Sequence, residues 1–168
     1  MEYPKRTGNR LTNYNYEQDG AYFITVCVKD RRRILCDIVG TSVPDCPKIQ
    51  LYKYGEIADR YINQMNNFYN EISVDSYIIM PDHIHFILCI KNGQSGRLVP
   101  TGYDNKNSTV ARFVGTFKRF CNKEYGENIW QSRYYDHVIR NEQDYIETVR
   151  YIENNPLKWM LQNKTQGE

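Results

Sequence analysis

The sequence predicts an α+β domain in which an antiparallel sheet carries two helices on one face. Three observations lead to this prediction: the order of strand-like and helix-like patterns along the chain, a two-residue link between two strand-like segments, and the length of 168 residues, which suits one compact domain. Hydrophobic residues make up 40% of the chain and charged residues 25%, close to the average of globular proteins, so wholesale disorder is not expected.

The first half of the chain contains three strand patterns and one helix pattern. Residues 21–28 are β-branched and aromatic, as in a strand. Residues 34–50 hold one glycine and two prolines, which predicts a loop or a short irregular excursion. In residues 52–69 apolar side chains recur every three or four positions, which predicts a helix. Residues 72–80 and 83–90 predict two strands, and their short link implies an antiparallel hairpin.

A polar loop and a second helix follow the hairpin. Residues 91–107 are rich in Gly, Asn and Ser and predict a flexible loop. Ser108 suits the N-cap of a helix and Gly126 suits its end, and the apolar side chains between them lie on one helical face.

A last strand and a third helix complete the chain. Residues 129–139 have the composition of a strand. Asn141 or Asp144 can cap the helix, which we expect to end at Pro156 because proline interrupts the backbone hydrogen bonds of a helix. The order strand, helix, strand, strand, helix, strand is the ferredoxin-like split β-α-β arrangement, an antiparallel sheet with two helices on one face. The third helix must lie elsewhere, and no boundary divides residues 1–168 into two domains.

Charge and cysteine content exclude several classes of protein. The net charge of +2 is not that of a polycation, so any affinity for nucleic acid must come from a local patch. No apolar stretch approaches the ~20 residues of a membrane helix, and the first residues lack the apolar segment of a secretion signal. The five cysteines are widely spaced and fit neither a disulfide framework nor a cysteine zinc site, so we expect a cytoplasmic protein. The 15 tyrosines suit an aromatic core or stacking on single-stranded nucleic acid.

Two pairs of residues could carry chemistry. His83 and His85 lie two apart in one strand, so their side chains share a face with Cα atoms roughly 6.5–7 Å apart and could converge on one metal ion. The spacing alone leaves open two ordinary histidines, each satisfied by water or a neighbour. Tyr151 and Asn155 lie four apart on one helix face. They could be a nucleophile and a metal ligand, or a packed side chain and a helix cap.

Residues 80–85, Met-Pro-Asp-His-Ile-His, resemble the histidine–hydrophobic–histidine (HUH) motif of single-tyrosine transposases. Residues 130–140 and 151–156 are similar to the C-terminal signature of REP-associated tyrosine transposases, which are relatives of the smallest insertion-sequence transposases. The resemblance extends from about residue 20 to about residue 160. It implies a ferredoxin-like core with the third helix against the open face of the sheet, and metal-dependent cleavage and rejoining of single-stranded DNA by transesterification.

The resemblance also implies roles for individual residues. His83, His85 and the Asn155 amide would hold Mg²⁺ or Mn²⁺, although imidazole by itself suits Zn²⁺ or a later transition metal better. Tyr151 would attack the scissile phosphorus and leave a 5′-phosphotyrosine and a free 3′-hydroxyl.

Several neighbours of these residues remain as alternatives. Asn154 and Glu147 are the reserve candidates for the third ligand, because a residue before proline is displaced from helical geometry. Tyr134 and Tyr135 compete as nucleophiles, but spacing does not tie either of them to an adjacent amide ligand. His137 belongs to the family signature without an assignable chemical role.

The resemblance implies that the partner is single-stranded DNA with imperfect hairpins, with no membrane involved and with the chain acting as a monomer or homodimer. An arginine triplet is the first choice for phosphate contact, because clustered cations bind phosphate. The candidate DNA-binding residues are Arg31, Arg32, Arg33, Lys118, Arg119, Lys5, Arg6 and Arg10. The last three lie in a basic arm, residues 1–18.

Two other functions fit parts of the sequence. One is a non-catalytic ferredoxin-like module that binds single-stranded nucleic acid, although the closely spaced sheet aromatics usual in such modules are absent. The other is a zinc hydrolase built on His83 and His85.

Overall fold

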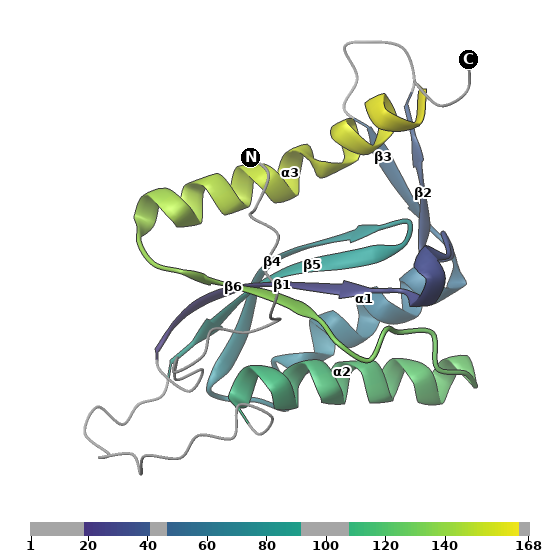
Figure 1. Cartoon of the computed structure of the whole chain (residues 1–168). Helices are drawn as coiled ribbons and strands as arrows, with labels where there is room; N and C mark the ends of the chain where they lie inside the picture. Colours follow the sequence, from purple (N-terminus) through teal and green to yellow (C-terminus); the bar gives the residue numbers. More distant parts are fainter. Residues whose placement is uncertain (1–18, 41–46, 92–107, 165–168) are drawn as a thin grey trace.

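The computed structural model describes residues 19–40, 47–91 and 108–164 (Figure 1). The predicted basic arm, residues 1–18, and residues 92–107 of the predicted flexible loop lie outside the described residues. The elements in chain order are β1 (Gly20–Cys27), the 3₁₀ turn η1 (Lys29–Arg31), β2 (Cys36–Val39), β3 (Lys48–Leu51), α1 (Lys53–Met65), β4 (Ile72–Met80), β5 (His83–Ile90), α2 (Thr109–Tyr125), β6 (Tyr135–Ile139) and α3 (Glu142–Lys164). Among the helices of these ranges, none has the length and apolarity needed to cross a membrane.

The main sheet has the ferredoxin-like strand order that the sequence predicts. The strands lie in the order β4-β5-β1-β6, and every neighbouring pair is antiparallel. Figure 1 shows α1 and α2 covering one face of this sheet and α3 crossing the opposite face. The prediction of an α+β fold with the third helix apart from the other two is confirmed.

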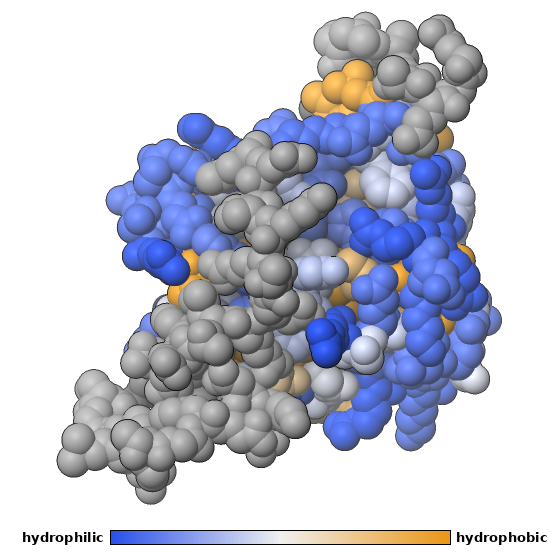
Figure 2. Space-filling model, viewed as in Figure 1, coloured by the Kyte–Doolittle hydropathy of each residue, from blue (hydrophilic) through white to orange (hydrophobic). Residues whose placement is uncertain are grey.

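The larger core lies between the sheet and helices α1 and α2. Tyr22 and Ile24 of β1, with Ile84 and Phe86 of β5, are fully buried there because alternate residues of a strand point to the same face. The predicted caps of α2 are confirmed. The Ser108 hydroxyl accepts a hydrogen bond from the Ala111 N–H at 3.2 Å, and Gly126 ends the helix with a left-handed φ of 74°. The outer surface in the same view is mostly hydrophilic (Figure 2).

Residues 34–50, predicted as a loop, contain a second, two-stranded sheet. β2 and β3 pair in antiparallel fashion from Cys36 opposite Leu51 to Val39 opposite Lys48. The prediction was wrong because it extended the loop character of the glycine and prolines to the whole segment. Side chains of β2 and β3 alternate between a packed and an exposed face, as in strands. Side chains such as Ile38 and Ile49 pack against the larger core, and this packing makes so short a hairpin stable.

Pro156 does not end the third helix, contrary to the prediction. α3 continues from Glu142 to Lys164 with Pro156 inside it. Proline inside a helix removes one backbone hydrogen bond and costs about 3 kcal/mol, so tertiary contacts must compensate. Pro156 is itself buried, and Asn163, two turns later, accepts a hydrogen bond from Arg33 at 2.9 Å. The last turns of α3 therefore lie against β2 (Figure 1).

Two other predicted boundaries shift for identifiable reasons. α1 ends at Met65 rather than near residue 69, and the next residue, Asn66, accepts a hydrogen bond from the Val74 N–H at 3.1 Å, which ties this turn to β4. β6 begins at Tyr135 rather than at residue 129. Residues 129–131 do pair with the end of β1 through an isolated antiparallel bridge between Val28 and Trp130. Carbonyls of residues 131–133 then accept hydrogen bonds from the Lys118 ammonium, which separates this bridge from β6.

The first turn of α3 is tethered to both edges of the main sheet. Asn141 caps the helix by accepting a hydrogen bond from the Asp144 N–H at 2.9 Å. The Asp144 carboxylate accepts from Nε2 of His137 in β6 at 2.9 Å, and the hydroxyl of the neighbouring Tyr145 donates to Asp75 in β4. Since β4 and β6 are the two edge strands, these contacts hold the helix across the full width of its own sheet.

Two helical glycines give a matched test of the packing. A Cβ on Gly55 in α1 would overlap the carbonyl oxygen of Leu35, whereas a Cβ on Gly115 in α2 would meet nothing within 4 Å. Gly55→Ala is expected to destabilise the protein by about 1–3 kcal/mol through overpacking. Gly115→Ala is expected to stabilise it by about 0.5–1 kcal/mol. Thermal unfolding of both variants measures this, and equal shifts would contradict the close approach of α1 to Leu35.

Candidate active site

Strand β5 places His83 and His85 on the sheet face opposite α1 and α2, beneath α3. The two side chains are 7% and 4% exposed, and their Nε2 atoms lie only 3.1 Å apart. Two nitrogen ligands at right angles, each about 2.1 Å from one ion, would be about 3 Å apart. The two imidazoles are therefore already spaced as neighbouring ligands of a single metal ion.

Each imidazole is oriented by a hydrogen bond at its other nitrogen. Nδ1 of His83 donates to the Asp82 carboxylate at 2.6 Å, and Nδ1 of His85 is hydrogen-bonded to the Thr25 hydroxyl at 2.8 Å. Asp82 also forms an ion pair with Nε of Arg31 at 3.0 Å. Such outer contacts fix ring orientation and leave Nε2 available to a metal.

Burial holds His85 in the form that binds metals. Desolvation, followed by the neighbouring charges of His83 and Arg31, lowers the pKa of His85 well below its usual 6.5. The imidazole is therefore neutral at physiological pH, and a neutral imidazole is the form with a free nitrogen lone pair.

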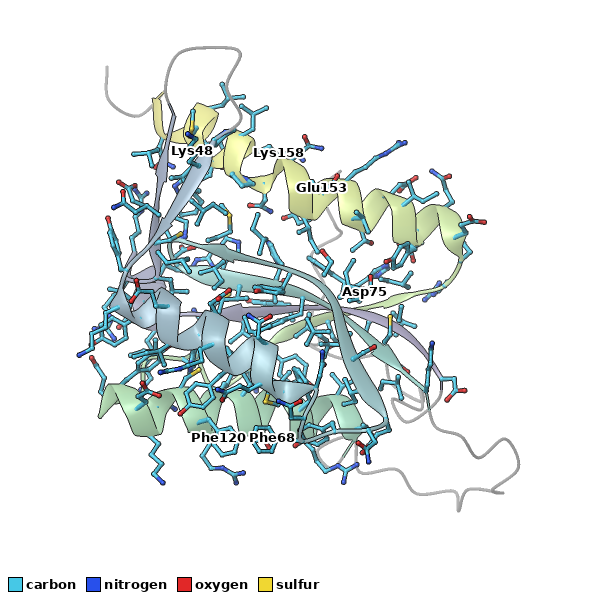
Figure 3. The ribbon with its side chains drawn as sticks, turned by 180° about the vertical axis from the view of Figure 1, so that it is seen from behind. Lys48, Phe68, Asp75, Phe120, Glu153 and Lys158 are labelled. Carbon is cyan, nitrogen blue, oxygen red and sulfur yellow. The ribbon has the colours of Figure 1, made fainter. Side chains whose placement is uncertain are left out.

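Helix α3 brings Tyr151 beside the histidine pair. Its ring centroid lies 5.4 Å from that of His85 and, edge-on, 5.8 Å from that of Phe23, which stacks in turn on His85. The Lys158 ammonium, two turns further along the helix, lies 5.1 Å from the centre of the Tyr151 ring. Figure 3 shows Lys158 on α3 in the view from behind. The structure thus gathers two imidazoles, a phenol and an ammonium group on one face of the sheet.

The three candidates for a third ligand differ in their surroundings. Asn155 is 8% exposed and forms no side-chain hydrogen bond with another residue of the described ranges. Asn154 is exposed and donates to the Arg150 carbonyl at 2.7 Å, and Glu147 accepts from Gln143 at 2.9 Å. Since Asn155 lies four residues after Tyr151 in a continuous helix, the two share a helix face. The geometry favours Asn155.

No group of three or more His, Cys, Asp or Glu side chains in the described part of the chain could hold a metal ion. Among the described residues, the remaining ligands of an ion at His83 and His85 would be neutral groups such as an amide, or water and substrate oxygens. This donor set leaves coordination positions open, which is typical of a catalytic site rather than a structural one.

The three arginines of the predicted DNA-binding triplet all have protein partners. Arg31 pairs with Asp82, Arg32 lies 3.5 Å from the Glu127 carboxylate, and Arg33 donates to Asn163. All three side chains are exposed. Arg119 is also exposed, with its guanidinium 5.7 Å from the centre of the Phe120 ring. Lys5, Arg6 and Arg10 lie outside the described residues.

Lys118, another candidate for DNA contact, is engaged by the protein backbone. Its ammonium donates to the carbonyls of Gln131 at 2.7 Å and Arg133 at 3.2 Å, and it lies 5.9 Å from the centre of the Tyr134 ring. Desolvation by burial lowers the pKa of Lys118 from its usual 10.5 to about 8. In this structure Lys118 holds the segment before β6 in place.

Two residues of the family signature, Tyr135 and His137, lie on the same sheet face as the histidines, whereas Tyr134 packs against the larger core. His137 forms the tether to Asp144 described above. Tyr135 pairs with Thr25, which also pairs with His85, so Tyr135 lies two strands from His85 on the same face and is 58% exposed. Tyr135 is thus the stronger of the two competing tyrosines.

Sequence reasoning missed Asp82, Thr25 and Trp159. Asp82 could have been found from its position next to the first histidine. Thr25 contacts His85 only because of the strand register, and Trp159 lies 6.2 Å from His83 between ring centroids only because α3 continues past Pro156.

Residues 17–155 match the sequence family described as "Transposase IS200 like". The chain belongs to the IS200-like transposase family. This membership confirms the resemblance seen in the histidine motif and the C-terminal signature, and it makes the chain a DNA strand-transferring enzyme.

Individual relatives of this transposase cover most of its length. A protein of Haemophilus influenzae named only as uncharacterised is 30% identical over 167 residues, spanning 92% of this chain and 89% of the relative. The REP-associated tyrosine transposase of Escherichia coli K12 is 27% identical over 149 residues, spanning 88% and 73%. The solved structure of a REP-associated tyrosine transposase bound to a REP hairpin superposes with a TM-score of 0.61 at 24% identity, spanning 89% and 73%, and shows that the fold is shared.

The environment of Lys118 predicts a pH-dependent stability. Because the folded-state pKa is below the unfolded one, the unfolded chain binds more protons between pH 8 and 10.5, so the contribution of Lys118 to stability rises with pH across this window. Chemical denaturation at several pH values is expected to show the wild type gaining stability relative to Lys118→Met above pH 8. Lys123→Met, at an exposed position of the same helix, is the control and should follow the wild type. A constant difference for Lys118→Met would contradict the burial of this ammonium.

Proposed function

We propose that this transposase cleaves and rejoins single-stranded DNA by transesterification, with Tyr151 as the nucleophile and Mg²⁺ or Mn²⁺ held by His83, His85 and Asn155. One observation supports this above the others: the two Nε2 atoms converge at 3.1 Å directly beside the ring of a tyrosine on the opposing helix. Family membership supports strand transfer in general, and this geometry supports Tyr151 as the nucleophile among the tyrosines of the described residues.

The proposed reaction exchanges one phosphodiester for another. The Tyr151 oxygen forms a bond to phosphorus, the bond from phosphorus to the 3′-oxygen breaks, and the phenol proton passes to solvent while the departing 3′-oxygen takes up a proton. The products are a 5′-phosphotyrosine and a 3′-hydroxyl. Because a phenolate leaves more readily than an alkoxide, a 3′-hydroxyl can reverse the step and rejoin a strand without ATP.

Members of the family generally depend on a divalent metal, and the donor atoms here fit one. When bound, the ion would supply Lewis-acid stabilisation of negative charge on the scissile phosphate. The residues themselves contribute orientation. Asp82 and Thr25 hold the two rings, and the tethers at Asp144 and Tyr145 hold α3 so that Tyr151 faces them.

We propose single-stranded DNA bearing imperfect hairpins as the substrate. The solved relative is named as bound to a REP hairpin, and the exposed arginines at positions 31–33 lie at the strand end next to the histidines, where a phosphate backbone could pass. Because α3 lies across the sheet of its own chain, a monomer already contains the nucleophile and both imidazoles, which favours a monomer over a homodimer. Four free cysteines among the described residues are compatible with a cytoplasmic protein.

The central test is the covalent intermediate. Purified protein is incubated with hairpin oligonucleotides in Mg²⁺ or Mn²⁺, and the adduct is resolved on a denaturing gel. Tyr151→Phe is expected to abolish the adduct, because phenylalanine has no oxygen to attack phosphorus, while folding is retained by circular dichroism. Tyr135→Phe, on the same sheet face, is the matched control and should leave the adduct intact.

Each other outcome selects a different function. An unchanged adduct in Tyr151→Phe together with its loss in Tyr135→Phe would move the nucleophile to β6. Hairpin binding without any adduct would favour a non-catalytic nucleic-acid module. Hydrolysis that persists in Tyr151→Phe with stoichiometric zinc would favour a zinc hydrolase.

A second test concerns the hydrogen bond that orients His83. Asp82→Ala removes the acceptor for Nδ1 and is expected to raise the dissociation constant for Mn²⁺ about 10- to 100-fold. Titration of the protein with Mn²⁺, followed by electron paramagnetic resonance of the free ion, measures this without DNA. Asp37→Ala, an exposed aspartate on β2, is the control, and an unchanged Mn²⁺ affinity in Asp82→Ala would remove Asp82 from the site.

A further inference from the structure

The last turns of α3 place an aromatic side chain, Trp159, beside the histidine pair. The proposed reaction does not use this side chain. The Trp159 ring centroid lies 6.2 Å from that of His83, and the two rings are tilted by 48°. Trp159 is only half-buried, so part of its indole surface remains open to solvent. The Arg33 guanidinium lies 5.1 Å from the centre of the same ring.

We propose that Trp159 and Arg33 form a binding site for one unpaired nucleotide next to the scissile phosphate, with the base stacked on the indole and its phosphate contacted by the guanidinium. The proposal rests on the proposed function, because it assumes that the scissile phosphate lies at His83 and His85. It adds a substrate contact that neither the histidine motif nor the tyrosine helix supplies.

The position of Trp159 relative to the histidine pair suits a contact with a strand bound at the pair. A phosphate at the histidine pair, facing Tyr151, has one neighbouring nucleotide on the Tyr151 side and one on the other side. His85 is the histidine next to Tyr151, and His83 is the one next to Trp159. The indole therefore lies on the side of the histidine pair away from Tyr151, where a nucleotide neighbouring the scissile phosphate would be within its reach.

The chemistry of the two side chains suits a nucleotide. An aromatic face stacks with any base, and arginine pairs with phosphate through its guanidinium. In the free protein, the Arg33 guanidinium lies over the indole ring and donates a hydrogen bond to Asn163 at 2.9 Å. A base could replace the guanidinium at the indole, and Arg33 would then be released toward the phosphate that accompanies the base.

The scaffold around Trp159 is built to hold the ring in place. α3 continues through Pro156, so Trp159 lies on a helix rather than on a free tail. Met160 packs so closely on Gly40 that a Cβ there would overlap its side chain, and this contact joins α3 to the end of β2. A ring held on a rigid element loses little conformational freedom on binding, which favours its use as a stacking surface.

The test measures base-dependent binding in the Tyr151→Phe background, where cleavage cannot interfere. The probes are a hairpin oligonucleotide with single-stranded thymidine flanks and a set in which one flanking nucleotide at a time is an abasic tetrahydrofuran. Fluorescence anisotropy gives each affinity at fixed ionic strength. Loss of a stacked base is expected to weaken binding about 5- to 150-fold at one position next to the stem.

The two side chains should produce different signatures. Trp159→Leu is expected to weaken binding of the intact probe and to abolish the difference between it and the abasic probe. Trp159→Phe, which keeps a ring, should retain most of that difference. Arg33→Ala should weaken binding of the intact probe more than that of the abasic probe, because only a stacked base releases the guanidinium toward the phosphate. It should also reduce the slope of log affinity against log salt concentration for the intact probe by about 1, which Trp159→Leu should not do directly.

The control is Phe68→Leu, which removes a more exposed aromatic ring, 57% accessible, from the layer of helices on the other side of the sheet (Figure 3). It should leave the abasic difference unchanged. An abasic difference that survives in Trp159→Leu would overturn the proposal. With Tyr151 restored, cleavage that becomes faster in Trp159→Leu, with no change in base dependence, would also overturn it, because the indole would then be obstructing the site.

These outcomes are separable from those of the proposed function. Absence of a tyrosine adduct in the wild-type protein would defeat the proposed reaction, whereas the abasic comparison needs no cleavage. A normal adduct combined with an unaltered abasic difference in Trp159→Leu would defeat only the nucleotide site.

Discussion

The candidate site depends on the register between strands β1 and β5. Cys27 lies opposite His83 and Thr25 opposite His85, so both imidazoles point away from α1 and α2 while Ile84, between them, enters the larger core. A slip of one residue would exchange the two faces of the strand and bury the imidazoles among apolar side chains. The hydrophobic core therefore specifies the position of the polar site, because the register that buries Ile84 is the one that exposes the histidines to α3.

The second requirement is that α3 remain seated over this face. A cluster of three buried residues, Phe23, Ile87 and Ile152, with partly buried side chains packed around it, provides the apolar contact beneath the helix. The polar contacts of Asp144 with β6 and of Tyr145 with β4 fix the position of the first turn of the helix. The far end of the helix is held by the β2–β3 hairpin, so Tyr151 lies on a segment supported on both sides.

The polar groups around the histidines form one connected chain rather than isolated pairs. Arg31 contacts both the Cys27 sulfur and the Asp82 carboxylate, and Asp82 contacts His83. Arg31 also has a positive φ of 54°, a backbone conformation that costs energy in a non-glycine residue and that often occurs at functional sites. The contact with Asp82 is one compensation for this strain. The arrangement gives the carboxylate, buried under a metal-ligand candidate, the counter-charge that it needs.

The sequence alone determined the order of the core elements, the shared face of the two histidines and the helical pairing of Tyr151 with Asn155, because these follow from periods of two and of about 3.6 residues. The β2–β3 hairpin, the passage of α3 through Pro156 and the contact between Thr25 and His85 could not be predicted in this way. Each depends on residues distant in sequence: packing against the larger core, the hold of Arg33 on the helix end, and strand register. Local preferences describe what a segment can adopt by itself, and only tertiary contacts supply the free energy that overrides a proline or joins a threonine to a histidine 60 residues away.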